Sequence, residues 1–262
     1  MFRATPALLL ILGLTASAAA PPPDAGWKSL FDGKTLGPWK SIAFGDEGKV
    51  HVKDGAIYLE KGRKMTGIVY SRADFPTTDY EITFEAKRVD GDDFFCTTTF
   101  PVGPDHCSFV VGGWRGTVFG ISNINGANAS ENVTTRSHEL ESGRWYRIRL
   151  RISRDRIETW IDRTKMVDLD TSELTLSLHL ASKPTRPFGI TSWDTTGAIR
   201  DLRLRRLTDA EKKAIAATRP RNDCAAKNRG GPDACAPGRP FPHPPIAHLA
   251  RASICFAVLS TY

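Results

Sequence analysis

Apolar and polar residues alternate with a period of two through most of the chain between Trp27 and Leu207. Successive side chains of a strand point to opposite faces, so each run predicts a strand with one buried and one wet face. Asp54-Gly55 separates two such runs and predicts a two-residue hairpin turn. The apolar positions of the clearest runs are Tyr80, Ile82, Phe84, Ala86, Tyr146, Ile148, Leu150, Ile152, Leu202 and Leu204. About a dozen strands with short turns predict an all-β jelly-roll sandwich of two antiparallel sheets.

One helix is predicted, from Thr208 to Ala217, at the end of the β-rich segment. Thr208 can cap it, and Glu211 stands three residues further on, in the spacing of a capping box. Residues 219–262 then lose all periodicity and are rich in Pro, Gly and Arg. We therefore expect a domain over 27–207, a short helix over 208–218, and a disordered tail over 219–262.

The first 20 residues have the pattern of a secretory signal peptide. A single Arg3 precedes the apolar run 8–14, and small residues at 18–20 suit a cleavage site. The apolar run is too short to span a bilayer, and no later segment is suited to do so. We expect residues 21–26 to form a leader and the protein to be exported, to the periplasm or the extracellular space.

Charge and cysteine content limit the function further. The net charge is +7, but six Lys and Arg against two Asp lie from Arg219 onward, so the predicted domain is close to neutral. We therefore expect no nucleic-acid partner. Export permits disulfides, and Cys96 and Cys107 are predicted to be able to pair across a hairpin. Cys224 and Cys235 bracket a tail segment, and Cys255 is left over.

Candidate catalytic groups lie between Asp90 and His138, where a long loop rich in Asn and Ser runs from 122 to 136. Long loops without regular structure are often functional. His106 and Glu131 are candidates for a general acid and base, and Asp93 for chemistry or metal binding. Each has a structural alternative, because a surface histidine, a solvated glutamate or an aspartate in a turn needs no function.

Two tryptophans in this sequence have polar neighbours, as aromatic rings at a sugar-binding cleft often do. Trp114 precedes Arg115, and Trp193 precedes Asp194. Stacking on sugar is one interpretation, and burial in the core is the other. Arg115, Asn123 and Asn132 supply candidate polar contacts to the same ligand. The sequence has no glycine-rich phosphate loop, no clustered His/Cys metal motif and no serine nucleophile elbow, which argues against nucleotide enzymes and serine hydrolases.

The chain resembles a known family in its opening motif and its last strands. Residues 26–39 read Gly-Trp-x-x-Leu-Phe-Asp-Gly-x-x-Leu-x-x-Trp, and the runs 144–148, 157–168 and 199–204 also fit. These features are similar to the 3-keto-disaccharide hydrolase family, also described as a 3-keto-glycoside 1,2-lyase/hydratase domain. The segments around Asp93 and Glu131 depart from its better-known members and resemble a subgroup of planctomycete-like secreted proteins.

The resemblance implies a concanavalin A-like fold and cleavage of the glycosidic bond of 3-keto-glycosides. A ketone at C3 acidifies the C2 proton, so the reaction needs a base, an acid and a group that stabilises an enolate. Our hypothesis is that His106 or Glu131 acts as base and acid, with Asp93 and Asn132 near the enolate or near a divalent cation. A divalent cation is the one cofactor that this chemistry could use. Trp114 and Trp193 would stack on the sugar.

Two other classes of function stay open. The same sandwich serves non-catalytic carbohydrate-binding modules, and it serves structural exported domains. Convergence of His106 and Glu131 in one cleft would favour catalysis, whereas positions on opposite edges would favour binding or a structural role.

Overall fold

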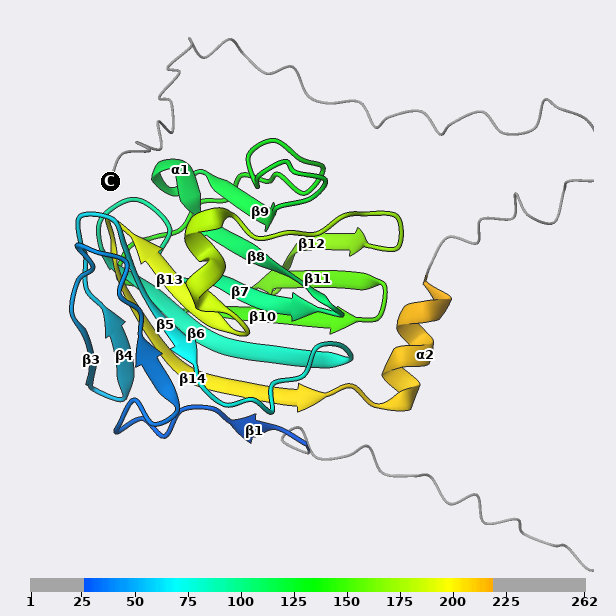
Figure 1. Ribbon diagram of the computed structural model, residues 1–262, viewed down its shortest axis with the longest axis horizontal. Helices are drawn as coiled ribbons and strands as arrows, with labels where there is room; N and C mark the ends of the chain where they lie inside the picture. The colour runs from blue at the N-terminus through cyan, green and yellow to red at the C-terminus, as the bar shows by residue number, and fades with distance from the viewer. Residues whose placement is uncertain (1–25, 219–262) are drawn as a thin grey trace, which may run out of the picture. The chain divides into compact units, whose positions relative to one another are not determined.

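Fourteen strands form two antiparallel sheets in the computed structural model, which describes residues 26–218 (Figure 1). The eight-stranded sheet has the order β12 (Thr164–Asp170), β11 (Arg156–Ile161), β10 (Tyr146–Ser153), β6 (Tyr80–Asp90), β14 (Thr196–Arg206), β4 (Ala56–Leu59) and β3 (Val50–Lys53), and β1 (Lys28–Ser29) pairs with β14. The six-stranded sheet has the order β2 (Trp39–Ser41), β5 (Met65–Tyr70), β13 (Gly189–Trp193), β7 (Thr97–Val102), β8 (Asp105–Gly112) and β9 (Val118–Ser122). The predicted all-β sandwich is confirmed.

The core lies between the two sheets and contains the residues that the alternation marks as apolar. Ile82 and Phe84 of β6 are buried there with Phe100 of β7 and Phe109 of β8. The Tyr80 hydroxyl donates a hydrogen bond of 2.6 Å to the carbonyl of Pro101, which links one sheet to the other. The polar members of each alternating run point to the outer faces.

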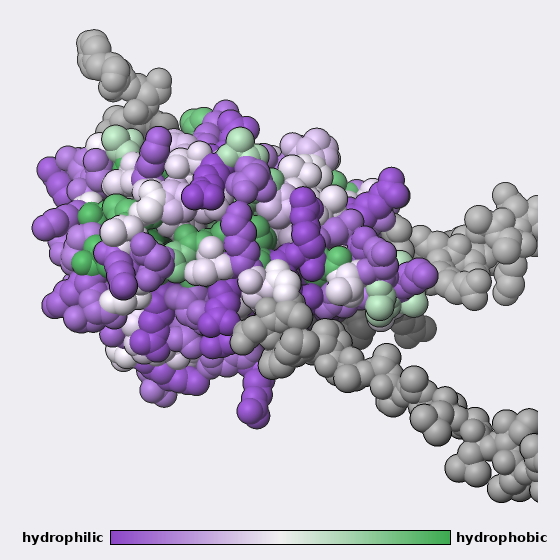
Figure 2. All heavy atoms as spheres, turned by 90° about the horizontal axis from the view of Figure 1, so that it is seen from below, coloured by the Kyte–Doolittle hydropathy of each residue, from purple (hydrophilic) through white to green (hydrophobic). Residues whose placement is uncertain are grey.

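The outer face of the eight-stranded sheet carries a network of ion pairs. Glu81 and Glu158 lie on this face and are nevertheless buried, because arginine and lysine side chains of the neighbouring strands cover them. Glu81 pairs with Arg149 and Arg205, and the Arg149 guanidinium also lies 3.7 Å from the ring centroid of Trp160. Trp160 is therefore covered by charged side chains rather than by a second sheet or a helix. Figure 2 shows that hydrophilic residues cover most of the side seen from below Figure 1.

Three short helical elements complete the described chain. α2 (Asp209–Ala217) agrees with the predicted helix, and Thr208 and Glu211 form the capping box. α1 (Gly113–Gly116) and the 3₁₀ element η1 (Leu180–Thr185) were not expected. Both are too short to leave a helical periodicity in the sequence.

The predicted pairing of Cys96 with Cys107 is wrong. Both side chains are buried free thiols. Cys107 stands opposite Phe100 in the β7–β8 ladder, four residues from Cys96. Four strand residues span about 13 Å, well beyond the reach of a disulfide. Cys224, Cys235 and Cys255 lie outside the described residues, as do the predicted signal peptide and tail.

Candidate functional site

Four of the eight predicted site residues lie together at one end of the six-stranded sheet. They are Asp93, Trp114, Arg115 and Trp193. β13 ends at Trp193, whose backbone N–H donates to the carbonyl of Phe94 at 2.9 Å. The rings of Phe94 and Trp193 are 6.3 Å apart, centroid to centroid. The Phe94 ring also reaches α1, because it lies 3.9 Å from where a Cβ on Gly113 would stand. We call Phe94, Trp114 and Trp193 the aromatic cluster.

The Trp114 side chain is presented by an unusual backbone turn. Trp114 and Arg115 have φ angles of 50° and 59°, in the left-handed region that non-glycine residues rarely adopt. Gly112 and Gly116 flank them with φ angles of 74° and 86°. The Trp114 side chain is 41% exposed, which is high for a tryptophan. A bulky apolar ring is thus held at the surface by a strained turn.

Asp93 stands beside this turn with its carboxylate fixed by backbone amides. Oδ1 accepts from the N–H of Phe94 at 2.7 Å, and Oδ2 accepts from the N–H of Arg115 at 3.0 Å. Burial raises the pKa of Asp93, and the nearby charges of Asp92 and Asp194 add to the rise, against the lowering effect of the two amides. A carboxyl with a raised pKa is suited to take and return a proton.

His106 lies away from the aromatic cluster. It stands opposite Pro101 near the start of β8, whereas Trp114 follows the far end of the same strand. Six residues separate His106 from Gly112, which is about 20 Å along a strand. Its Nε2 is buried without a hydrogen-bond partner among the described residues. Burial and the charge of Arg186 lower the pKa of His106, against Asp105, so the ring is neutral at neutral pH.

Glu131 and Asn132 belong to a loop that packs on β9. Glu131 is exposed, and its Oε2 accepts from Asn128 Nδ2 at 2.8 Å. The Asn132 amide group is used inside the loop: Nδ2 donates to the carbonyls of Ile121 and Asn128 at 2.8 and 2.7 Å. Its Oδ1 accepts from the N–H of Thr134 at 2.9 Å. Asn132 therefore holds the loop together.

His106 and Glu131 do not converge. The Glu131 loop packs on Gly120, where an added Cβ would lie 3.0 Å from the Thr134 carbonyl oxygen. Gly120 pairs with Val110, which is four residues, or about 13 Å, from His106 along β8. Asn123 lies at the end of β9, and its Oδ1 accepts from Ser122 Oγ at 2.5 Å. The pair on which the catalytic interpretation depended is thus separated.

Two residues of these sites were not found from the sequence. Phe94 precedes the fully buried Phe95 in an irregular segment before β7, so no alternation marks its partly exposed position. Arg186 reaches His106 from a distant part of the chain, and no local pattern marks it. Within 26–218 no group of three or more His, Cys, Asp or Glu side chains is arranged to hold a metal ion.

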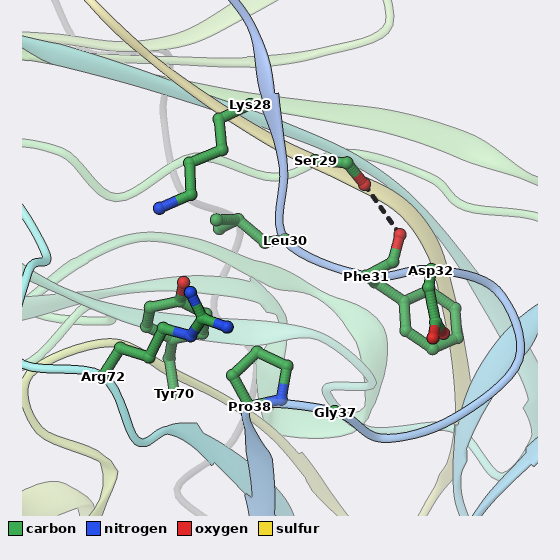
Figure 3. A pocket seen from close by; sticks show the side chains of 9 residues that line it. All are labelled: Lys28, Ser29, Leu30, Phe31, Asp32, Gly37, Pro38, Tyr70 and Arg72. Atoms are coloured by element: carbon green, nitrogen blue, oxygen red, sulfur yellow. Dashed lines mark hydrogen bonds between the residues drawn. The ribbon is translucent and has the colours of Figure 1, made fainter.

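Two cavities of the described chain lie away from the predicted site residues. One, of about 240 Å³, is lined by residues of β1, the turn that follows it, and Tyr70 and Arg72. Figure 3 shows Lys28 and Arg72 extending on one side of it, with Phe31 and Asp32 on the other. The Lys28 ammonium is bound to Asp74 at 3.1 Å. The other cavity, of about 420 Å³, lies between α2 and the β10–β11 turn.

Residues 26–205 match the model of the 3-keto-alpha-glucoside-1,2-lyase-like domain, which is more than half of the chain. The chain therefore belongs to this family, as the opening motif predicted. No curated protein sequence matches it. The narrower subgroup stays a prediction.

Solved structures resemble this one at low sequence identity. The Crh5 transglycosylase in complex with NAG is 12% identical, with 70% of this chain and 85% of that chain covered and a TM-score of 0.50. Carbohydrate-binding module CBM66 from Bacillus subtilis is 14% identical, with 64% and 95% covered and a TM-score of 0.44. Domain 4 of AbnA, a GH43 extracellular arabinanase from Geobacillus stearothermophilus in complex with arabinotriose, is 14% identical, with 73% and 97% covered and a TM-score of 0.46. No helix within 26–218 is long and apolar enough to cross a membrane.

Proposed function

We propose that the protein cleaves the glycosidic bond of 3-keto-glycosides at the aromatic cluster, with Asp93 as the base. One observation carries this proposal: the Asp93 carboxyl, with its raised pKa, lies beside the partly exposed rings of Phe94, Trp114 and Trp193. Family membership supports the substrate class. Asp93 replaces His106 as the first candidate base, because His106 lies near the start of β8, whereas Asp93 bonds to the turn that carries Trp114. Glu131 is exposed in the loop that packs on β9, and its carboxylate binds Asn128.

The chemistry that the residues would perform follows from the ketone. The C3 carbonyl acidifies the proton on C2, and Asp93 would take that proton. The C1–O bond then breaks as the C1–C2 double bond forms, and the leaving oxygen takes the proton that Asp93 removed from C2, which returns Asp93 to its carboxylate. Water adds to the double bond of the product in a later step. Two backbone amides fix the carboxylate, so little reorganisation is needed on reaction. The aromatic rings would stack on the apolar face of the sugar.

Asp93→Asn tests the assignment, because it keeps the shape of the side chain and one acceptor oxygen but removes the base. We expect turnover of a 3-keto-glucoside to fall at least about 100-fold, the usual contribution of a general base, and the dissociation constant to change much less, although one of the two backbone N–H groups loses its acceptor. Asp54→Asn, in the hairpin turn between β3 and β4, removes the same charge far from the cluster and should leave turnover unchanged. Wild-type turnover by Asp93→Asn would exclude Asp93 as the base.

A second candidate function is non-catalytic carbohydrate binding. It is favoured by the position of His106, which lies about 20 Å along β8 from Gly112 and so from the turn that carries Trp114. Wild-type protein that binds glycosides in a manner dependent on Trp114, but turns over no 3-keto-glycoside with or without added divalent cation, would establish this function instead.

We also propose that the protein is exported. The support for export is the signal-peptide pattern of residues 1–20. Expression of the full chain in a bacterial host, followed by N-terminal sequencing of the periplasmic and medium fractions, tests it. We expect a new N-terminus after Ala20 in one of those fractions. Full-length protein confined to the cytoplasm would contradict export.

A further inference from the structure

The turn that carries Trp114 needs bracing. Two consecutive non-glycine residues in the left-handed region cost about 1–2 kcal/mol each. Trp114 is also 41% exposed, and the exposed part of its ring gains no burial to offset the cost. Neighbouring groups must therefore stabilise the left-handed conformation of the turn, and their contacts show which residues do so.

Arg115 receives these bracing contacts on both its backbone and its side chain. Its N–H donates to Asp93 Oδ2 at 3.0 Å, and its Nη2 lies 2.7 Å from Asp92 Oδ2. The backbone of Asp92 also packs under the turn, since a Cβ on Gly116 would stand 3.0 Å from the Asp92 carbonyl oxygen. Two adjacent aspartates thus bind Arg115, the residue that follows Trp114.

The Asp92 backbone is itself anchored to the body of the domain. Arg88 Nη1 lies 3.4 Å from the Asp92 carbonyl oxygen. Arg88 Nη2 donates to the carbonyl of Leu140 at 2.6 Å, and Nε donates to Ser142 Oγ at 3.1 Å. A continuous set of contacts therefore runs from β6 through Asp92 and Arg115 to the Trp114 backbone.

The Asp92–Arg115 ion pair is too exposed to serve the stability of the whole fold. The two side chains are 53% and 81% exposed, and such pairs contribute about 0–1 kcal/mol. The position of the pair is more informative than its strength. It fixes the direction of the chain one residue after Trp114, at the side of the aromatic cluster.

We propose that Asp92 is a positioning residue for carbohydrate binding, which holds the Trp114 indole outward through its ion pair with Arg115. This inference rests on the proposed function, in which Trp114 stacks on the sugar. Asp92 contacts the turn at Arg115, the residue after Trp114. Its removal should weaken sugar binding through Trp114 while chemistry at Asp93 continues.

The test measures binding of methyl α-glucopyranoside and its 3-keto form to the full chain by calorimetry, and thermal unfolding in parallel. Asp92→Asn should weaken binding about fivefold, the equivalent of losing an exposed pair, and should change Tm little. KM for the 3-keto form should rise in proportion with kcat unchanged. Asp92→Glu, which can still reach Arg115, should restore most of the affinity.

Asp74→Asn is the matched control, because Asp74 forms an equally exposed pair with Lys28, at 57% and 52%, far from the cluster. It should leave binding unchanged. Arg115→Gln removes the pair from its other side and should reproduce the effect of Asp92→Asn. Asp92→Asn with wild-type affinity, or Asp74→Asn with the same loss, would overturn the inference alone. Wild-type protein that binds neither glycoside would overturn the proposed function and this inference with it.

Discussion

Replacing Glu211 by Gln should weaken the docking of α2 in a manner that depends on pH. The Glu211 carboxylate accepts from Arg205 Nη1 and Nη2 at 2.9 and 2.7 Å, and from the N–H of Thr208 at 2.8 Å. The bond from Arg205, with those from Thr208, lowers the pKa of Glu211 from its ordinary 4.5 to about 2. The carboxylate therefore stabilises the folded state.

The magnitude follows from linkage between protonation and folding. The gap between 4.5 and about 2 corresponds to about 3.4 kcal/mol as an upper limit. The Glu211 side chain is 30% exposed and shares Arg205 with Glu81, so solvent screening reduces the expected loss to about 1–2 kcal/mol. Because the folded pKa is the lower one, this stability is complete above about pH 4.5 and disappears as the pH falls through 2.

Urea unfolding of wild type and Glu211→Gln between pH 7 and pH 2 measures the difference. We expect a gap of about 1–2 kcal/mol at pH 7 that shrinks below pH 4.5 and closes near pH 2. Glu173→Gln removes the same charge from an exposed position and should show no gap at any pH. A gap of equal size at pH 7 and pH 2 would refute the reasoning, because it could not then come from an ionised carboxylate.

Two further predictions concern the core. Tyr80→Phe should lower the free energy of unfolding in urea by about 1–2 kcal/mol, because the buried Pro101 carbonyl loses its hydrogen-bond donor. Tyr58→Phe, at a half-buried position of β4, should lower it little. Equal losses from the two variants would contradict the prediction. The second prediction uses a chain in which Cys224, Cys235 and Cys255 are replaced by Ser. The two remaining thiols, Cys96 and Cys107, should react with a thiol reagent only on unfolding, because burial raises the pKa of both. Rapid labelling of the native protein would show that one of them is accessible.

The fold could be predicted because apolar and polar residues alternate within each strand, independently of the rest of the chain. The alternation at 80–87 and 146–153 marks which side chains enter the core, and the structure buries Tyr80, Ile82, Ile148 and Ile152 as expected. The same alternation misses the burial of Glu81, which depends on arginines from β10 and β14. Period-two patterning reports a residue's face and not what covers that face.

The candidate site could be predicted only in part, because it depends on contacts between distant segments. The sequence marked Asp93 and Trp114 separately as candidate site residues, and the fold brings them together. His106 and Glu131 carried equal signals, and the fold separates them. The left-handed turn at Trp114 and Arg115 has no sequence signature beyond its flanking glycines. The register between β8 and β9, which sets the distance from His106 to the strand position that faces the Glu131 loop, follows from packing.

The pairing of β1 with β14 has a consequence for how the protein is made. Lys28 stands opposite Leu204, so the first strand of the domain meets its hydrogen-bonding partner only after nearly all of the domain has been synthesised. Contacts between such distant parts of a chain form slowly, because a long loop must close first. The β1–β14 pair consequently forms only after the last strand has left the ribosome, so the N-terminal strand is among the last parts of the sheet to be secured.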